Sequence, residues 1–143
     1  APGFTLMNTG NADMTVTGGT VKCGGIKTGY ALMAAGSAAK LTVSGGDIEA
    51  IQSIGGAQVN ISGGSVYCEG VYYALYNGGG NTSISGGYFY SPTGKNIYVA
   101  SGTVKTTGGY FSDKSAPLES GYKFQDISVT ENGNQYNYQV VSE

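Results

Sequence analysis

Four tyrosines are the side chains in this sequence best placed to bind a ligand. Each lies two or four residues after the first glycine of a Gly-Gly pair, and the four are Tyr67, Tyr88, Tyr90 and Tyr110. If the pairs mark equivalent positions in successive turns of the chain, these side chains form one exposed patch. Tyrosine offers an apolar ring face that stacks on sugars and a hydroxyl that forms hydrogen bonds. We therefore predict a binding face for a polysaccharide or surface glycan, with simple stacking of exposed strand residues as the alternative interpretation.

Catalysis on a polysaccharide would require other residues. A lyase uses Lys or Arg as a base, usually beside Ca²⁺ held by carboxylates, and a glycosidase uses two carboxylates at a defined separation. The chain has seven basic residues, all of them lysine, and nine scattered acidic residues. Asp47 and Glu49 are the one pair on a single outward strand face, and Lys22 is placed to form a surface ion pair with Glu49. We expect no catalytic residue and no enzyme; the alternative, a lyase or glycosidase, would need a lysine beside carboxylates in a cleft.

Metal and thiol chemistry are also disfavoured by composition and spacing. The sequence has no His, no Cys-x-x-Cys and no Asp-rich calcium loop, so we expect no metal site and no cofactor. Cys23 and Cys68 occupy equivalent positions two turns apart, or about 9.6 Å, which exceeds the roughly 7 Å between α-carbons that a disulfide allows. We expect a stack of small buried residues formed by Cys23, Ala50, Cys68 and Ser91.

The charge and hydropathy of the chain exclude two classes of partner. The formal net charge is -2, and the lysines are not clustered, so we expect no nucleic-acid binding. An apolar run of 18 residues is missing, so we expect no membrane span. The first ten residues, APGFTLMNTG, lack the charged and apolar regions of a secretion signal.

Glycine pairs give the chain its organisation. The repeated phrases are MTVTGGTVKC, LTVSGGDIEA, VNISGGSVYC, TSISGGYFYS and VKTTGGYFSD. Their first glycines are Gly18, Gly45, Gly63, Gly86 and Gly108, so the differences between successive positions are 27, 18, 23 and 22 residues. A variable spacing around one constant phrase is typical of a solenoid in which loops of different length join similar coils.

Each phrase predicts two short strands separated by a corner. β-branched and aromatic residues alternate with polar ones, which indicates strands with one buried face. The residues expected to point inward are Val16, Val43, Ile61 and Ile84 before the glycines, and Val21, Ile48, Val66, Phe89 and Phe111 after them. The glycines predict a sharp corner where a side chain would obstruct a positive φ or the close approach of the neighbouring coil.

A third short strand follows in most coils. The segments FTLMN, GYALMA, YYALYN and NIYVAS fit this element, and we expect Tyr72, Tyr73 and Tyr76 to be split between its faces and partly buried. Three strands per coil predict an all-β parallel β-helix of about five to six coils, stacked about 4.8 Å apart. An antiparallel β-sandwich is the alternative fold, but it would not require the same phrase at every strand.

The two ends of the chain differ in pattern. Residues 1–113 carry the repeats, whereas Lys114 to Glu143 alternate polar and apolar residues around Asn132-Gly133, a strong hairpin signal. We interpret residues 114–143 as a capping segment and hairpin that protect the open end of the solenoid. The amino end begins within a coil, so we expect the chain to be a fragment of a longer solenoid.

The phrases LTVSGGDIEA, VNISGGSVYCEG and TSISGGYFYS, followed by TTGGYFSDKSAPLESGYKF and YNYQVV, resemble the Gly-Gly-aromatic repeats of cell-surface proteins of gut Firmicutes. The chain is also similar to non-catalytic carbohydrate-binding right-handed β-helix proteins of clostridia, with their pectin-lyase-like fold, although it lacks their dense acidic cluster. The resemblance implies a bacterial module that is extracellular or attached to the cell surface within a longer surface protein.

These observations predict a right-handed parallel β-helix with a carboxy-terminal hairpin cap. We expect a non-catalytic surface module that binds a glycan through Tyr67, Tyr88, Tyr90 and Tyr110. The alternative is a structural stalk or a protein adhesin module with no small ligand, for which the repetition alone would suffice.

Overall fold

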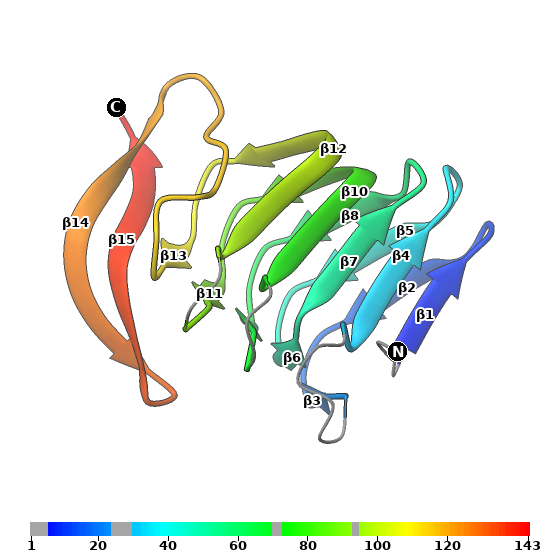
Figure 1. Ribbon diagram of the computed structural model, residues 1–143, viewed down its shortest axis with the longest axis horizontal. Helices are drawn as coiled ribbons and strands as arrows, with labels where there is room; N and C mark the ends of the chain where they lie inside the picture. The colour runs from blue at the N-terminus through cyan, green and yellow to red at the C-terminus, as the bar shows by residue number, and fades with distance from the viewer. Residues whose placement is uncertain (1–5, 24–29, 70–72, 93–94) are drawn as a thin grey trace.

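The computed structural model describes residues 6–23, 30–69, 73–92 and 95–143, which form strands and connections and contain no helix. Two sheets make up the fold (Figure 1). The first contains β1 (Leu6–Thr9), β2 (Asp13–Val16), β4 (Leu32–Ala35), β5 (Lys40–Val43), β7 (Ile51–Ile54), β8 (Gln58–Ile61), β10 (Leu75–Ile84) and β12 (Ile97–Thr106). The second contains β3 (Thr20–Val21), β6 (Asp47–Glu49), β9 (Ser65–Tyr67), β11 (Tyr88–Tyr90), β13 (Tyr110–Phe111), β14 (Tyr122–Glu131) and β15 (Asn134–Ser142).

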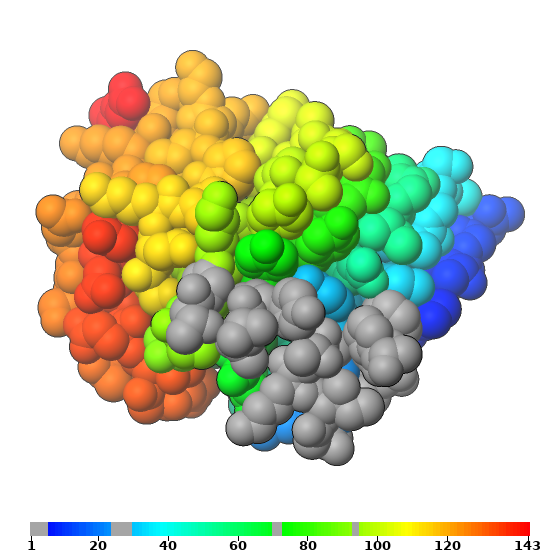
Figure 2. Space-filling model, in the orientation of Figure 1, coloured from blue at the N-terminus to red at the C-terminus, as the bar shows by residue number. Residues whose placement is uncertain are grey.

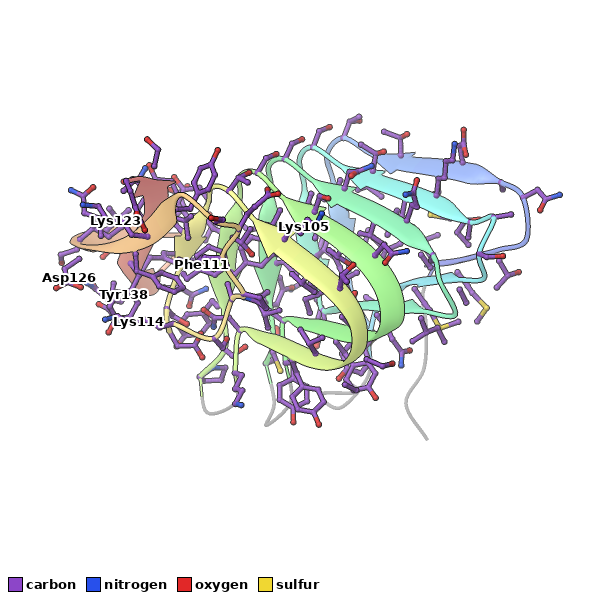
Figure 3. The ribbon with its side chains drawn as sticks, turned by 90° about the horizontal axis from the view of Figure 1, so that it is seen from above. Lys105, Phe111, Lys114, Lys123, Asp126 and Tyr138 are labelled. Carbon is purple, nitrogen blue, oxygen red and sulfur yellow. The ribbon has the colours of Figure 1, made fainter. Side chains whose placement is uncertain are left out.

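The long strands β10 and β12 show how the first sheet covers two sides of the molecule. The first part of β10 pairs with β7 and its last part pairs with β8, with register shifts between Asn77 and Asn81. In the earlier coils two separate strands, such as β7 and β8, lie on either side of this corner, whereas β10 bends around it as one strand. Figure 3 shows the bend in the ribbons of β10 and β12. With the second sheet as the third side, the chain winds through about four turns of a parallel β-solenoid, so the predicted solenoid is confirmed and the sandwich is wrong.

The interior is built from like residues stacked in register. Val43 pairs with Val16 and Ile61, and Ile48 pairs with Val21 and Val66. All nine residues predicted to point inward are buried, and the rings of Phe89 and Phe111 stack with their centroids 4.9 Å apart. Because each fully buried aliphatic or aromatic side chain contributes about 1.5–3 kcal/mol, these columns account for much of the cohesion between coils.

The glycine corners lie between the two strands of each phrase, as predicted, and the two glycines serve different purposes. A Cβ on Gly63 would lie 2.5 Å from the carbonyl oxygen of Ser44 in the preceding coil, and the first glycines of the other later corners are as crowded. The second glycine, Gly64, has a φ of 85°, in the region that side chains disfavour. Both predicted reasons for the Gly-Gly pair therefore apply.

Strand β7 was not predicted. It begins directly after Ala50, which takes the turn with a φ of 67° in place of a longer connection. This direct connection explains why Gly45 and Gly63 are only 18 residues apart. The repeated Gly-Gly phrase predicts only the two strands that flank the glycines and not the third strand of the coil. The segment IQSI also has no glycine corner directly before it to mark its start.

The tail forms the predicted hairpin. Asn132 and Gly133 join β14 to β15 with φ values of 51° and 79°, and a type I′ turn requires positive φ at both central residues. Strand β15 pairs antiparallel with β13, so the hairpin extends the second sheet. The ring of Phe124 packs edge-on against Phe111, and Lys114 lies 5.0 Å from the ring centre of Tyr138 (Figure 3).

Residues 112–119 run across the last coil and supply partners for its backbone. The N–H of Thr106 donates to the Pro117 carbonyl at 3.0 Å, and Glu119 N–H donates to the Thr106 carbonyl. The N–H of Ile97 donates to the Ser115 hydroxyl at 2.9 Å. This segment thus pairs with both ends of β12, at Ile97 and at Thr106.

The predicted stack of small residues is present in part. Cys68 is buried and lies one residue beyond the Glu49–Tyr67–Tyr90 column, next to Ala50 and Ser91, whereas Cys23 is only half-buried. Burial, followed by the nearby Glu49 carboxylate, raises the pKa of the Cys23 thiol. A raised pKa disfavours the thiolate, which is the reactive form.

We predict that Gly63→Ala lowers the free energy of unfolding by roughly 2–4 kcal/mol, because its Cβ would collide with backbone that cannot move without separating two coils. Gly18→Ala is the matched control, since a Cβ at Gly18 meets no atom within 4 Å. Urea unfolding of both variants measures the difference. Equal losses for the two variants would contradict the role assigned to coil contact.

Candidate ligand-binding groove

The outward residues of the second sheet form two columns in the register expected from the sequence. One column contains Thr20, Asp47, Ser65, Tyr88 and Tyr110. The other contains Glu49, Tyr67 and Tyr90. The fold therefore brings all four predicted tyrosines onto one face of adjacent coils.

The hairpin packs on this face, which the sequence did not predict. Tyr136 of β15 is 1% exposed, and its ring lies edge-on to Tyr88 at 5.2 Å and to Tyr90 at 6.3 Å between centroids. Tyr88 in turn stacks on Tyr110 at 4.7 Å. As a result the four predicted tyrosines are half-buried rather than fully exposed.

A groove of about 630 Å³ remains between the hairpin and the outward columns. Its volume lies within the range of small-molecule sites. The lining residues are Thr20, Lys22, Asp47, Ser65, Tyr67, Cys68, Glu69, Tyr90, Pro92, Asn132, Asn134 and Tyr136. Of the four predicted tyrosines, Tyr67 and Tyr90 line this groove, whereas Tyr88 and Tyr110 do not.

The tip of the hairpin closes one side of the groove. The side-chain amide of Asn132 donates to the Asp47 carboxylate and to the Ser65 hydroxyl, each at 3.3 Å. Asn132, Asn134 and Tyr136 are the groove residues of the hairpin, and sequence reasoning missed all three. Their even spacing along the tail offered the one signal, because alternate residues of a strand share a face.

The charges of the groove are mixed, with an excess of carboxylates. Lys22, Asp47 and Glu69 line it, so two acidic groups accompany one lysine. Glu49, predicted at the surface, is only 3% exposed, and its Oε1 accepts the N–H of Cys23 at 2.9 Å. Asp47 and Glu49 therefore share the outward face of β6 as expected, but Glu49 is enclosed by its neighbours rather than exposed at the surface.

Two tyrosines of the groove are held in their neutral form. Burial, and then the Glu49, Glu69 and Asp47 carboxylates, raise the pKa of Tyr67 to about 12. Burial is also the main cause that raises the pKa of Tyr136 to about 12. Both phenols are therefore hydrogen-bond donors at neutral pH and not bases.

A second tyrosine cluster lies elsewhere on the solenoid. Tyr73 stacks on Tyr98 at 4.5 Å, Tyr98 stacks on Tyr76 at 5.6 Å, and Tyr30 lies 5.9 Å from Tyr76. Tyr73 and Tyr76 are 6.3 Å apart and half-buried, so they are partly buried as predicted and their rings lie close together. Tyr72 lies outside the described residues.

Two other features are missing from the part of the chain that the structure describes. Within residues 6–23, 30–69, 73–92 and 95–143, no three His, Cys, Asp or Glu residues gather as metal ligands would. No helix there is long and apolar enough to cross a membrane. Comparisons with protein-family models, curated proteins and solved structures found no match.

We predict that the protein loses stability as the pH rises from about 10 towards 12. Because the pKa values of Tyr67 and Tyr136 are raised above 10 in the folded state, folding favours the neutral phenols. Their contribution is complete below the unfolded pKa of about 10 and is lost as the pH approaches the folded value.

The double variant Tyr67→Phe/Tyr136→Phe should show a shallower alkaline decline in the free energy of unfolding, measured by urea titration at each pH. Tyr98→Phe, in the second tyrosine cluster outside the groove, is the control for removal of a tyrosine hydroxyl. An unchanged slope in the double variant would contradict the assignment.

Proposed function

We propose that this protein is a non-catalytic bacterial module, extracellular or at the cell surface, that binds a neutral polysaccharide or surface glycan in the groove. The observation that carries the proposal is the groove itself, which combines three tyrosine rings with amide, hydroxyl and charged groups. Tyr67 and Tyr90 belong to the predicted set, and Tyr136 is added by the hairpin.

The chemistry of a sugar matches this lining. A pyranose has an apolar face that packs on aromatic rings and a rim of hydroxyls that need donors and acceptors. Tyr67 and Tyr90 are paired neighbours on adjacent coils, so their rings are offset along the solenoid axis as successive sugars of a chain would be. Asn132, Asn134 and Lys22 supply donors, while Asp47 and Glu69 supply acceptors.

The charge of the groove supports a neutral ligand over an acidic one. Two carboxylates against one lysine leave a negative balance, which repels uronic acids or sulfated sugars. The environment of the nearby Glu49 and the protonation of Tyr67 do not favour catalysis. Glu49 is enclosed and accepts a backbone N–H, and Tyr67 with a pKa of about 12 is a poor base at neutral pH.

The proposal includes the finer features of the predicted fold. Right-handed winding is the general rule for connections between parallel strands of one sheet. Five coils would correspond to the five successive rows of parallel strands, and six coils would add one further row. The hairpin and residues 112–119 would act as the carboxy-terminal cap, since they supply partners to the last coil.

A structural stalk or protein adhesin module is the second candidate. It is favoured by the packing of Tyr88 between Tyr110 and Tyr136, which gives those tyrosines a role in holding the hairpin. In that case the groove would be a by-product of hairpin docking.

A polysaccharide lyase is the third candidate, because Lys22 lies in the same groove as Asp47 and Glu69. Incubation of the protein with neutral and acidic polysaccharides, with and without Ca²⁺, followed by product analysis, tests it directly. Shortened chains that disappear in Lys22→Met would establish an enzyme.

We predict that Tyr67→Ala and Tyr90→Ala each weaken binding to a neutral polysaccharide by roughly ten-fold, as expected for the loss of one stacking contact of about 1.4 kcal/mol. Calorimetry against a polysaccharide panel measures the affinity, and circular dichroism confirms folding. Tyr98→Ala, in the second tyrosine cluster, is the control and should bind as the parent does.

Failure of the parent to bind any neutral polysaccharide would overturn the proposal and leave the stalk or adhesin module. Equal losses for Tyr98→Ala and Tyr67→Ala would show that the groove is not the site.

A further inference from the structure

Gly18 is a glycine that no contact within the described chain requires. At the later corners, Gly45, Gly63, Gly86 and Gly108 lie against the carbonyl group of the preceding coil, where a Cβ cannot fit. A Cβ at Gly18 would meet no atom within 4 Å, and its φ is outside the left-handed region. Among the described glycines, Gly18 alone combines an open Cβ position with an ordinary φ.

The side chains of the first coil show the same pattern. Leu6 and Met7 are 39% and 49% exposed, whereas their register partners Leu32 and Met33 are 0% and 8% exposed. Leucine and methionine at these two positions are therefore buried in the second coil and exposed in the first coil. Exposed large apolar side chains beside an open strand edge mark a contact surface.

The backbone of this coil is also open on one side. β1, β2 and β3 each pair with a single strand, β4, β5 and β6 respectively, and they end the strand order of their sheets. In Figures 1 and 2 this coil, in blue, forms the end of the molecule opposite the hairpin. The free edges of β1, β2 and β3 belong to one coil. In each later coil the corresponding strand edges are the ones that pair with the neighbouring coil.

We propose that the edge formed by β1, β2 and β3 is a docking surface for one further coil of the same repeat. Its three strands would run parallel to this edge, and the carbonyl before its own Gly-Gly pair would lie over Gly18. Only that arrangement recreates the geometry that makes the first glycine necessary at the four later corners.

The opposite end of a second copy does not fit this requirement. There the Thr106 N–H already donates to Pro117, and β13 already pairs with β15. A second copy therefore offers only part of a coil edge in parallel register, because its hairpin covers β13 and residues 112–119 bond to both ends of β12. The occupant is therefore a coil whose strand edges on the side facing β1, β2 and β3 have no other partner.

Docking would also extend the groove. Thr20 and Lys22 of the first coil line the groove, so a further coil would add outward residues in line with them. The inference itself does not depend on the proposed glycan, because it rests on Gly18 and the open edge.

The test is a fusion that places a copy of residues 32–50 ahead of Ala1 in the full chain. Six residues then separate the copied third strand from Leu6, the same number that separates β11 from β12. The control fusion carries the same residues in scrambled order. Hydrogen–deuterium exchange is measured on peptides covering β1 and β2.

We predict that the ordered fusion slows amide exchange in β1 and β2 by roughly ten-fold or more relative to the scrambled fusion. Gly18→Ala should leave the Tm of the natural chain within about 1 °C but lower that of the ordered fusion by roughly 5 °C or more. This reversal distinguishes a docked coil from general stabilisation.

Three results would overturn the proposal. The first is equal exchange in the ordered and scrambled fusions, and the second is an equal effect of Gly18→Ala in the fused and natural chains. The third is a dimer of the natural chain, detected by light scattering, whose β1 and β2 amides are already protected, since the edge would then accept a second copy.

Discussion

The close approach of one coil to the next at the glycine corners is the constraint on which the structure depends. At each later corner a backbone carbonyl occupies the position that a Cβ of the following coil would need, as Ser44 does for Gly63. This contact sets the register of the coils. Once the corners are superposed, the strands on both sides pair in parallel, and identical residue types fall into columns.

The same register acts on both faces of each strand. Inward, it stacks aliphatic and aromatic residues into a continuous core that ends in the Phe89–Phe111 pair. Outward, it stacks polar residues and tyrosines on the second sheet. Outward residues can therefore vary to form a binding face without changing the inward columns or the glycine corners that stabilise the fold.

The hairpin changes what that outward face can do. By placing Tyr136 against Tyr88 and Tyr90, it converts a flat tyrosine surface into a groove with walls from two parts of the chain. The turn residue Asn132 has a double role. Its positive φ forms the turn, and its amide reaches Asp47 and Ser65 across the groove.

The sequence by itself determined the features that depend on local or repeated chemistry: the glycine corners, the inward columns, the tyrosine columns and the Asn132-Gly133 turn. Each is visible because the same physical requirement recurs in every coil or acts within a few residues. Only the tertiary structure decided that the hairpin folds onto the tyrosine face, since Asn132 is 85 residues from Asp47 and no periodic pattern links them. It also decided which tyrosines line the groove and that Glu49 is enclosed, because burial depends on neighbours contributed by distant segments.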